Sequence, residues 1–400
     1  MDLKTFEELL SPVGQSALAA AMDWQPSEAA FLPTFEKLRK KYPADLAKAA
    51  VETAILRGKA ASKFPLAKRM YFTREALEQS SSSAVAEHRA KRFRDYATVA
   101  DLCCGIGADA IALAAAGCHV TAIDRDPLRA RMAEANLAAC GHAEQSQVLV
   151  ADVLTDSRPT VDAIFCDPSR RADGRRFLSV ADYLPSPQAV LARFPSDFPA
   201  GIKLAPGVPQ DDLMQFDGEA EFISLNGELK ECVIWLGPLR TSARRATVLP
   251  TGQTLAAESP APAPPIHQPL RYVYDPDPAV TRSGLVTDFA QTIDGKLLDS
   301  QVAFVTSDRL AETPFATAYE VEETLPFHAK RLGEWMRSHN IGRVTPIKRG
   351  SSVDTDELVR RWKLKGDEHR AVLLTVCDGN AVAIIGNRAV ATTDSRPLPS

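Results

Sequence analysis

The stretch Val99-Ala-Asp-Leu-Cys-Cys-Gly-Ile-Gly-Ala108 decides the fold. A short apolar strand runs into a Gly-x-Gly turn, and an alanine-rich helix is expected to follow and to end at Gly117. Glycines let the backbone approach a ligand closely, and the N-terminus of the helix lies beside that ligand. A second strand over 120–124 ends in the lone carboxylate Asp124, about 20 residues after the turn, where such folds hold a ribose.

The glycine pattern differs from the usual dinucleotide fingerprint Gly-x-Gly-x-x-Gly. Gly105 and Gly107 are present, but position 110 is alanine, and Asp101 lies four residues before the first glycine. An acidic residue there would repel a pyrophosphate and suit a cation. S-adenosylmethionine carries an amino group and a sulfonium but no phosphate, so these residues favour that methyl donor over a dinucleotide.

Two further apolar strands also end in carboxylates. The strand at 147–152 ends at Asp152, and the strand at 161–167 ends at Asp167. In an open parallel sheet, the carboxyl ends of the strands line the ligand crevice. The sequence therefore predicts an α/β fold with a doubly wound, Rossmann-like sheet and one acidic crevice. The four acids expected there are Asp101, Asp124, Asp152 and Asp167.

Length and composition limit the number of domains and the class of protein to be expected. Four hundred residues with 45% apolar content can bury large cores and suggest two or three domains. The sequence shows no 18-residue apolar run and no signal-peptide pattern at its start, so we expect a cytoplasmic protein without a membrane partner. Its seven cysteines are an odd number without a Cys-x-x-Cys pair. We therefore expect free thiols and no metal site.

The chain divides into four expected segments. They are a helical, basic N-terminal region at 1–94, the doubly wound core at 95–238, a proline-rich linker at 239–270 and an α+β module at 271–400. In the first segment, a helix over 75–93 is expected to be interrupted near Ser80–Ser83. The core should end in strands at 201–205, 220–224 and 231–236, with a hairpin turn at Asn226-Gly227.

The last segment alternates strands and helices. Strands are expected at 315–322, 371–376 and 381–386, and helices at 326–338 and 354–363. Asp378-Gly379-Asn380 is typical of a tight turn between the last two strands. The expected module is therefore of the α+β class.

Charge is distributed unevenly along the chain. The formal net charge is −4, yet Lys37–Arg94 holds 15 Lys/Arg against 5 Asp/Glu. A basic segment in an acidic protein indicates contact with a nucleic acid. Solvated helix faces are the alternative explanation.

The order of these segments resembles the bacterial class I S-adenosylmethionine-dependent methyltransferases that carry a C-terminal THUMP-like domain. The likeness rests on Asp167-Pro-Ser-Arg-Arg171 in the core and Ile347-Lys-Arg-Gly350 in the last segment. Ala86-Glu-His-Arg-Ala90, followed by Asp101-x-x-Cys-Gly-x-Gly107, is also similar to cap trimethylguanosine synthases and other RNA methyltransferases. THUMP domains bind RNA, so the resemblance implies RNA as the partner.

The resemblance also implies a role for each residue of the cofactor site. Asp101 and Gly105 would lie near the methionine part of the cofactor, Asp124 on the ribose hydroxyls and Asp152 near the adenine amino group. Gln79, on the helix before the first strand, would cover the site. The predicted cofactor-binding residues are Gln79, Asp101, Cys103, Gly105, Gly107, Asp124 and Asp152.

Asp167-Pro168 predicts the acceptor side of the site. Enzymes that methylate exocyclic amines commonly carry Asn/Asp-Pro-Pro-aromatic at this strand end, where the side-chain oxygen and the proline carbonyl accept hydrogen bonds from the amine. Transfer is then helped mainly by positioning. Here Ser169-Arg170 replaces the proline and the stacking aromatic residue. A guanidinium from Arg170 or Arg171 could stack instead, and so could Phe177 or Tyr183. The predicted catalytic residues are Asp167, Pro168 and Arg170.

Asp-Pro-x-Arg also resembles the RNA uridine C5-methyltransferases, in which a cysteine nucleophile adds to the base. That family places the cysteine in a turn after the next strand. Here the strand leads into Leu204-Ala-Pro-Gly207, which has no cysteine. This absence disfavours covalent C5 chemistry.

The sequence thus predicts S-adenosylmethionine-dependent methyl transfer to a base nitrogen of RNA. The predicted RNA-binding residues are Arg171, Arg175, Lys348 and Arg349. Three alternatives stay open: methylation of a small molecule, methylation of a protein, or RNA binding with the cofactor but without transfer.

Overall fold

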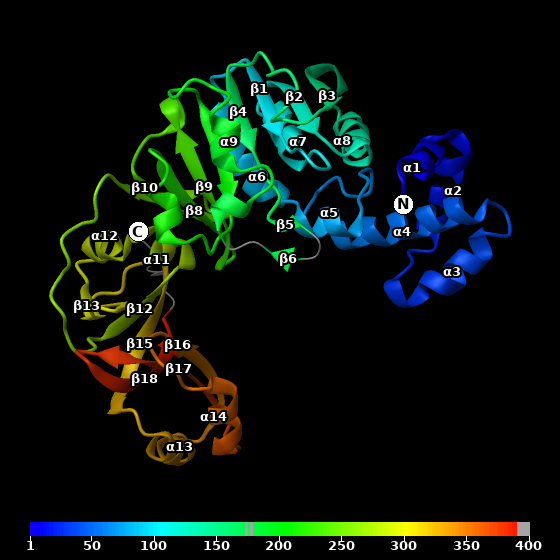
Figure 1. Ribbon diagram of the computed structural model, residues 1–400. Coiled ribbons are helices and arrows are strands. Elements are labelled where there is room, and N and C mark those ends of the chain that lie inside the picture. The colour runs from blue at the N-terminus through cyan, green and yellow to red at the C-terminus, as the bar shows by residue number, and fades with distance from the viewer. Residues whose placement is uncertain (173–174, 177–178, 390–400) are drawn as a thin grey trace, which may run out of the picture. The chain divides into compact units, whose positions relative to one another are not determined.

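The computed structural model describes residues 1–172, 175–176 and 179–389. The chain forms two compact units, whose helices and strands Figure 1 labels. The first unit holds residues 1–219 and 231–241, and the second holds residues 220–230 and the chain from 242 onward. The finer division into four segments expected from the sequence stays a prediction.

The first unit begins with helices, as expected. Their bounds are α1 (Leu3–Leu10), α2 (Pro12–Asp23), α3 (Phe31–Leu38) and α4 (Ala44–Ala60). The side chains of Asp2 and Ser11 accept hydrogen bonds from the first turns of α1 and α2, which places the start of each helix. Phe6 and Leu9 are buried in a core that also contains Met132, a residue of the following α/β region. The N-terminal helices are therefore packed into this unit.

Two short helices lead into the sheet. They are α5 (Arg74–Gln79) and α6 (Ser83–Ala90), so the predicted break near Ser80–Ser83 is confirmed. The buried side chain of Asn136 fixes the approach to them. It accepts from the Tyr71 N–H at 2.7 Å and donates to the carbonyls of Tyr71 and Ile106 at 3.0 and 2.9 Å. One amide thus ties the segment before α5 to the glycine turn.

The predicted doubly wound sheet is confirmed. In the first unit its strands run in the order β9-β7-β4-β1-β2-β3. The bounds are β1 (Thr98–Leu102), β2 (His119–Asp124), β3 (Ser146–Val150), β4 (Ala163–Cys166), β7 (Ala200–Leu204) and β9 (Glu228–Leu236). All neighbours are parallel except β9, which is antiparallel to β7. Helices α7 (Ala108–Ala115) and α8 (Pro127–Ala139) make the first two crossovers.

The strand order reverses between β1 and β4. From β1 the chain moves outward through β2 to β3 and then returns to the other side of β1 as β4. Ligands of open α/β sheets bind outside the carboxyl ends of the strands at such a switch point. The topology therefore predicts a ligand site at the residues that follow β1 and β4.

Smaller elements complete this unit. The bounds are β5 (Arg171–Ala172), β6 (Arg175–Arg176), α9 (Pro187–Leu191) and α10 (Gln210–Leu213).

A buried arginine links the lead-in helix to the sheet. Arg89 of α6 is 2% exposed and forms ion pairs with Asp109 of α7 and Glu231 of β9. Burial lowers the pKa of Arg89, but the two carboxylates outweigh it, and the pKa is raised overall. The guanidinium also lies over the ring of Phe165, 5.0 Å from its centroid. Arg89 therefore holds three elements together behind the ends of β1 and β4.

Replacing this arginine should destabilise the first unit strongly. Arg89→Met would leave the buried carboxylate of Glu231 and the largely buried carboxylate of Asp109 without their cation. Such a loss costs about 3–5 kcal/mol of unfolding free energy. Urea unfolding measures the loss. Lys91→Met, at an exposed position of the same segment, is the control and should cost little. A loss in Arg89→Met no larger than in the control would refute this role.

The second unit contains a small group of strands at its start. Their bounds are β8 (Glu219–Leu225), β10 (Arg244–Leu249) and β11 (Gln253–Ala257). The predicted turn at Asn226-Gly227 is confirmed, with φ of 55° and 78°. The expectation of a linker over 239–270 is wrong for its first part, because β10 pairs parallel with β8 and antiparallel with β11. The β-branched Thr247 and Val248 suit such a strand, and the proline run starts only at Pro260.

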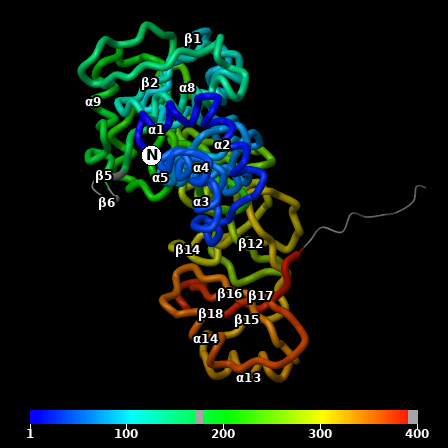
Figure 2. Tube along the Cα trace, turned by 90° about the vertical axis from the view of Figure 1, so that its right-hand side faces the viewer, coloured from blue at the N-terminus to red at the C-terminus, as the bar shows by residue number. Residues whose placement is uncertain are grey.

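The rest of this unit is a seven-stranded sheet in the order β13-β14-β12-β15-β18-β17-β16. The bounds are β12 (Tyr272–Pro276), β13 (Lys296–Asp299), β14 (Val302–Ser307), β15 (Ala316–Pro326), β16 (Ile341–Lys348), β17 (Glu368–Cys377) and β18 (Asn380–Arg388). The helices are α11 (Pro278–Ser283), α12 (Val286–Thr292), α13 (Ala329–Ser338) and α14 (Thr355–Trp362). Figure 2 shows α13 and α14 beside β16–β18, and the predicted hairpin at 378–380 is confirmed.

None of the helices in the described part of the chain is long and apolar enough to cross a bilayer.

Candidate active site

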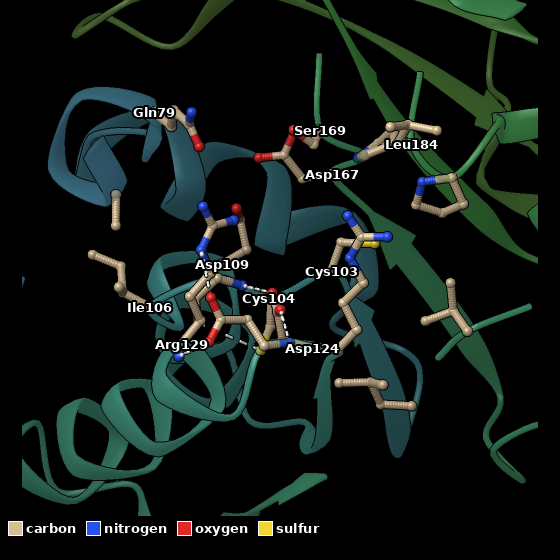
Figure 3. A pocket seen from close by; sticks show the side chains of 18 of the residues that line it. Gln79, Cys103, Cys104, Ile106, Asp109, Asp124, Arg129, Asp167, Ser169 and Leu184 are labelled. Carbon is tan, nitrogen blue, oxygen red and sulfur yellow. Dashed lines mark hydrogen bonds and ion pairs between the residues drawn. The ribbon is translucent and has the colours of Figure 1, made fainter. Parts of the chain in front are cut away.

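A cavity of about 560 Å³ opens at the carboxyl ends of the strands in the first unit. Its volume is within the range of small-molecule sites. Most of the residues predicted for the cofactor and the acceptor line it: Gln79, Cys103, Gly105, Asp124, Asp152, Asp167, Pro168 and Arg170. Figure 3 shows Asp124 at one side of this cavity and Asp167, next to Ser169, at the other. The structure therefore brings the two predicted halves of the site into one space.

The turn after β1 depends on left-handed backbone. Gly105 has φ of +57° and Gly107 has φ of +82°, conformations that glycine adopts without a steric penalty. A Cβ on Gly107 would lie 3.2 Å from both Cα and Cβ of Ala133 in α8. Gly107 is thus needed for helix packing and does not line the cavity. Cys103 lines it with φ of +63°, which is uncommon for a residue other than glycine.

Asp124 is held by the glycine turn itself. Its Oδ2 accepts from the Gly105 N–H and its Oδ1 from the Asp126 N–H, both at 2.9 Å. The residue is 6% exposed, and burial raises its pKa although both N–H groups oppose the shift. Each carboxylate oxygen has a second lone pair. Asp124 can therefore hold the turn and still accept hydrogen bonds from a ligand.

Asp101 does not line the cavity. It is 1% exposed at the end of β1, and neither carboxylate oxygen has a hydrogen-bond partner among the described residues. Burial raises its pKa well above the ordinary value, and Asp109 and Asp167 add to the shift, whereas Arg89 opposes it. A buried acid without a partner is ready to receive a cation or to hold a proton.

Asp152 and Gln79 line the cavity and already have partners in the protein. Asp152 accepts from the Leu154 N–H at 2.8 Å. Gln79, at the end of α5, donates to Glu75 at 3.0 Å. The contact of Asp152 with adenine and the covering role of Gln79 stay predictions.

Lys203 is a site residue that the sequence analysis missed. It lies on β7, is 5% exposed, and its Nζ is 2.6 Å from Oδ2 of Asp167. The signal was a lone cation inside the apolar run Gly201-Ile-Lys-Leu-Ala205, since a buried lysine is rare without a partner. The carboxylate of Asp167 is therefore already paired with the ammonium group of Lys203.

The acceptor side lacks the expected aromatic substitute. Tyr183 is 1% exposed and its hydroxyl accepts from the Ala205 N–H, so the expectation that it could turn into the site is wrong. Phe177 lies outside the described residues.

Ser169 and Leu184 exchange backbone hydrogen bonds at 2.9 and 3.0 Å. Arg170 lines the cavity, and its Nη1 is buried without a partner in the described structure.

The predicted RNA-binding residues fall into two groups. The side chains of Arg171 and Arg175 lie outside the described part of the structure. In the second unit, Lys348 is exposed and donates to the Val353 carbonyl at 3.0 Å. The guanidinium of Arg349 is 2.6 Å from Asp275 and also donates to the Pro276 carbonyl at 2.8 Å. Arg349 thus has a structural role in fixing β12.

The described residues contain no group of three or more His, Cys, Asp or Glu side chains placed to hold a metal ion. All seven cysteines are free thiols.

Comparison with known proteins identifies the family of the chain. A THUMP domain-like family model matches residues 316–388, and a domain of unknown function matches residues 2–60. Two uncharacterized S-adenosylmethionine-dependent methyltransferases of Mycobacterium tuberculosis, from strains CDC 1551 and H37Rv, are 34% identical over 336 residues, which are 81% of this chain and 91% of theirs.

A crystal structure from Porphyromonas gingivalis W83, assigned to the methyltransferases, has a TM-score of 0.75 at 21% identity and covers 94% of this chain and 99% of its own. That likeness shows the fold.

The chain belongs to the S-adenosylmethionine-dependent methyltransferases with a C-terminal THUMP-like domain. It is an S-adenosylmethionine-dependent methyltransferase, and the cavity fits the methyl donor on two counts. Asp124 offers acceptors to two hydroxyls, and the cavity has the volume of a small-molecule site. Which residues touch the donor stays a prediction.

The role of Asp124 can be tested by calorimetry. Asp124→Asn keeps one acceptor for the turn but loses the charge, and a hydrogen bond to a charged group contributes about 1.5–3 kcal/mol. The affinity for S-adenosylmethionine should therefore fall at least ~10-fold. Glu134→Gln, on the exposed face of α8, is the matched control. Unchanged affinity in a folded Asp124→Asn protein would reject the assignment.

Proposed function

We propose that this methyltransferase acts on RNA and transfers the methyl group to a base nitrogen. The observation that carries the proposal is Asp167-Pro168 at the end of β4, in the same cavity as Asp124. A hydrogen-bond acceptor in one cavity with the predicted ribose site supports an amine as the methyl acceptor. Arg170 lines the cavity, and its buried Nη1 has no hydrogen-bond partner among the described residues, so we assign it to contact the flanking base or phosphate.

The chemistry needs positioning more than acid or base strength. S-adenosylmethionine, when bound, supplies a methyl group whose S–C bond breaks with the electron pair left on sulfur. Asp167 and the Pro168 carbonyl would accept the N–H groups of the acceptor and direct its lone pair, which forms the new N–C bond. The nitrogen then releases its proton to water.

An RNA acceptor is supported by the THUMP-like match at 316–388 and by exposed cations. In this region Arg343, Lys348, Lys363 and Lys365 are exposed. In the N-terminal basic segment, fewer Lys and Arg residues are available to bind RNA than the sequence suggested. Arg57 donates to the Met70 carbonyl, Arg89 is buried with two acids, and Arg92 is paired with Glu219. The exposed remainder still includes Lys37, Lys40, Lys41, Lys48 and Lys68.

Asp167 should separate chemistry from cofactor binding. Asp167→Ala removes the proposed acceptor contact but none of the residues assigned to the donor. Turnover on bulk RNA from a strain that lacks the gene should fall at least ~100-fold, because positioning groups commonly contribute this much. Calorimetric affinity for S-adenosylmethionine should stay within a factor of about three, which is under 1 kcal/mol. Asp197→Ala, at an exposed site away from the cavity, is the control. Equal loss of turnover and affinity would instead indicate a structural role.

RNA binding should depend steeply on salt. Each phosphate neutralised on single-stranded RNA contributes about −0.7 to the slope of log affinity against log salt. The double variant Arg343→Ala, Lys348→Ala should bind more weakly and with a flatter slope, while its S-adenosylmethionine affinity stays unchanged. Lys4→Ala, an exposed lysine on α1, serves as the control. Absence of salt-dependent RNA binding in the wild-type protein would favour a small-molecule or protein substrate.

A further inference from the structure

Lys203 is a charged residue in a buried position, which is rare for lysine. It lies inside a buried strand whose five residues are all buried. Burying an ammonium costs several kcal/mol unless a partner compensates. Strands β4 and β7 are parallel, and Cys166 pairs with Ile202, so Asp167 and Lys203 come next in the same register. The sheet itself therefore places the ammonium beside the carboxylate.

The pair is asymmetric in its contacts. Lys203 Nζ lies 2.6 Å from Oδ2 of Asp167 and has no other hydrogen-bond partner in the described structure. Oδ1 of Asp167 has no hydrogen-bond partner in that part of the chain, and the side chain is 27% exposed where it lines the cavity. One oxygen is held from the protein side, and the other is left for a ligand.

The charges around Asp167 make this cation necessary. Asp101 on β1 and Asp109 on α7 are acids of the same cluster, and Arg89 on α6 is already paired with Asp109 and Glu231. Cys166, next in sequence, is a buried thiol whose pKa is raised, chiefly by a hydrogen bond with Cys103 and by burial. Arg170 lines the cavity as a further cation. Among these groups, Lys203 is the cation in direct contact with the Asp167 carboxylate.

We propose that Lys203 is a positioning residue for methyl transfer: it holds Oδ2 of Asp167 so that Oδ1 accepts the N–H of the acceptor amine. The proposal rests on the proposed function in taking the acceptor to be an amine. Lys203 does not touch the reacting atoms. It fixes the direction of the carboxylate that does.

Two substitutions separate charge from shape. Lys203→Met has a similar length and no charge, and Lys203→Arg keeps the charge. Both are assayed with tritiated S-adenosylmethionine and bulk RNA from a strain that lacks the gene, between pH 5 and pH 9, with cofactor affinity measured by calorimetry. Lys203→Met should lower kcat at least 10-fold while the calorimetric affinity stays within threefold.

Rescue by the conservative variant distinguishes positioning from a purely structural role. Lys203→Arg keeps a cation beside the Asp167 carboxylate and should retain kcat within about threefold across this pH range, which is under 1 kcal/mol. Lys203→Met should lose kcat while its cofactor affinity stays. A Lys203→Met enzyme with unchanged kcat, or with equal loss of kcat and cofactor affinity, would overturn the proposal.

A stability cycle covers the case in which Lys203→Met folds poorly. Asp167→Asn leaves the buried ammonium of Lys203 unpaired, and Lys203→Met leaves the partly exposed Asp167 carboxylate beside Asp101 without its cation. The double variant removes both charges. The double variant should have a higher urea midpoint than either single variant, and additive losses would overturn the pairing. If the wild-type enzyme methylates a protein or a metabolite but no RNA, the proposed function fails, and the same variants are scored on that acceptor.

Discussion

The structure depends on how it compensates negative charge at the switch point of its sheet. Asp101, Asp109 and Asp167 gather where β1 and β4 end, in surroundings that exclude much of the water. Two buried cations from other elements, Arg89 on α6 and Lys203 on β7, pair with this cluster. Unpaired buried charges are strongly destabilising. The ion pairs therefore hold α6 beside α7, and β7 beside the end of β4.

This arrangement suits the chemistry of the family. Acids that are incompletely compensated favour a cationic methyl donor over a phosphate-bearing cofactor. The N-terminal helices also support the site. Asn136 links the backbone of Tyr71 to that of Ile106 in the glycine turn. Helix α5 places Gln79 at the cavity. The domain of unknown function at 2–60 therefore packs into the core that supports the site.

The sequence predicted the strands and their terminal acids because each follows an apolar run with a turn signal. It did not predict the pairing of cations, because Arg89 occurs in a stretch that looks like a solvated basic helix. Its partner Glu231 is 142 residues away, and its partner Asp109 lies on a separate helix beyond β1. For the same reason the charge count overestimated the exposed basic surface, and Arg349, expected on RNA, is paired with Asp275. Strands β10 and β11 were missed because nearby prolines and glycines dominated the local pattern.

The most direct test of the account is a crystal structure of the protein with S-adenosylhomocysteine. We expect the ribose hydroxyls within hydrogen-bond distance of Asp124 and the sulfur facing Asp167 across the cavity. A nucleoside bound elsewhere, or bound in this cavity with its ribose away from Asp124 and its sulfur away from Asp167, would contradict it.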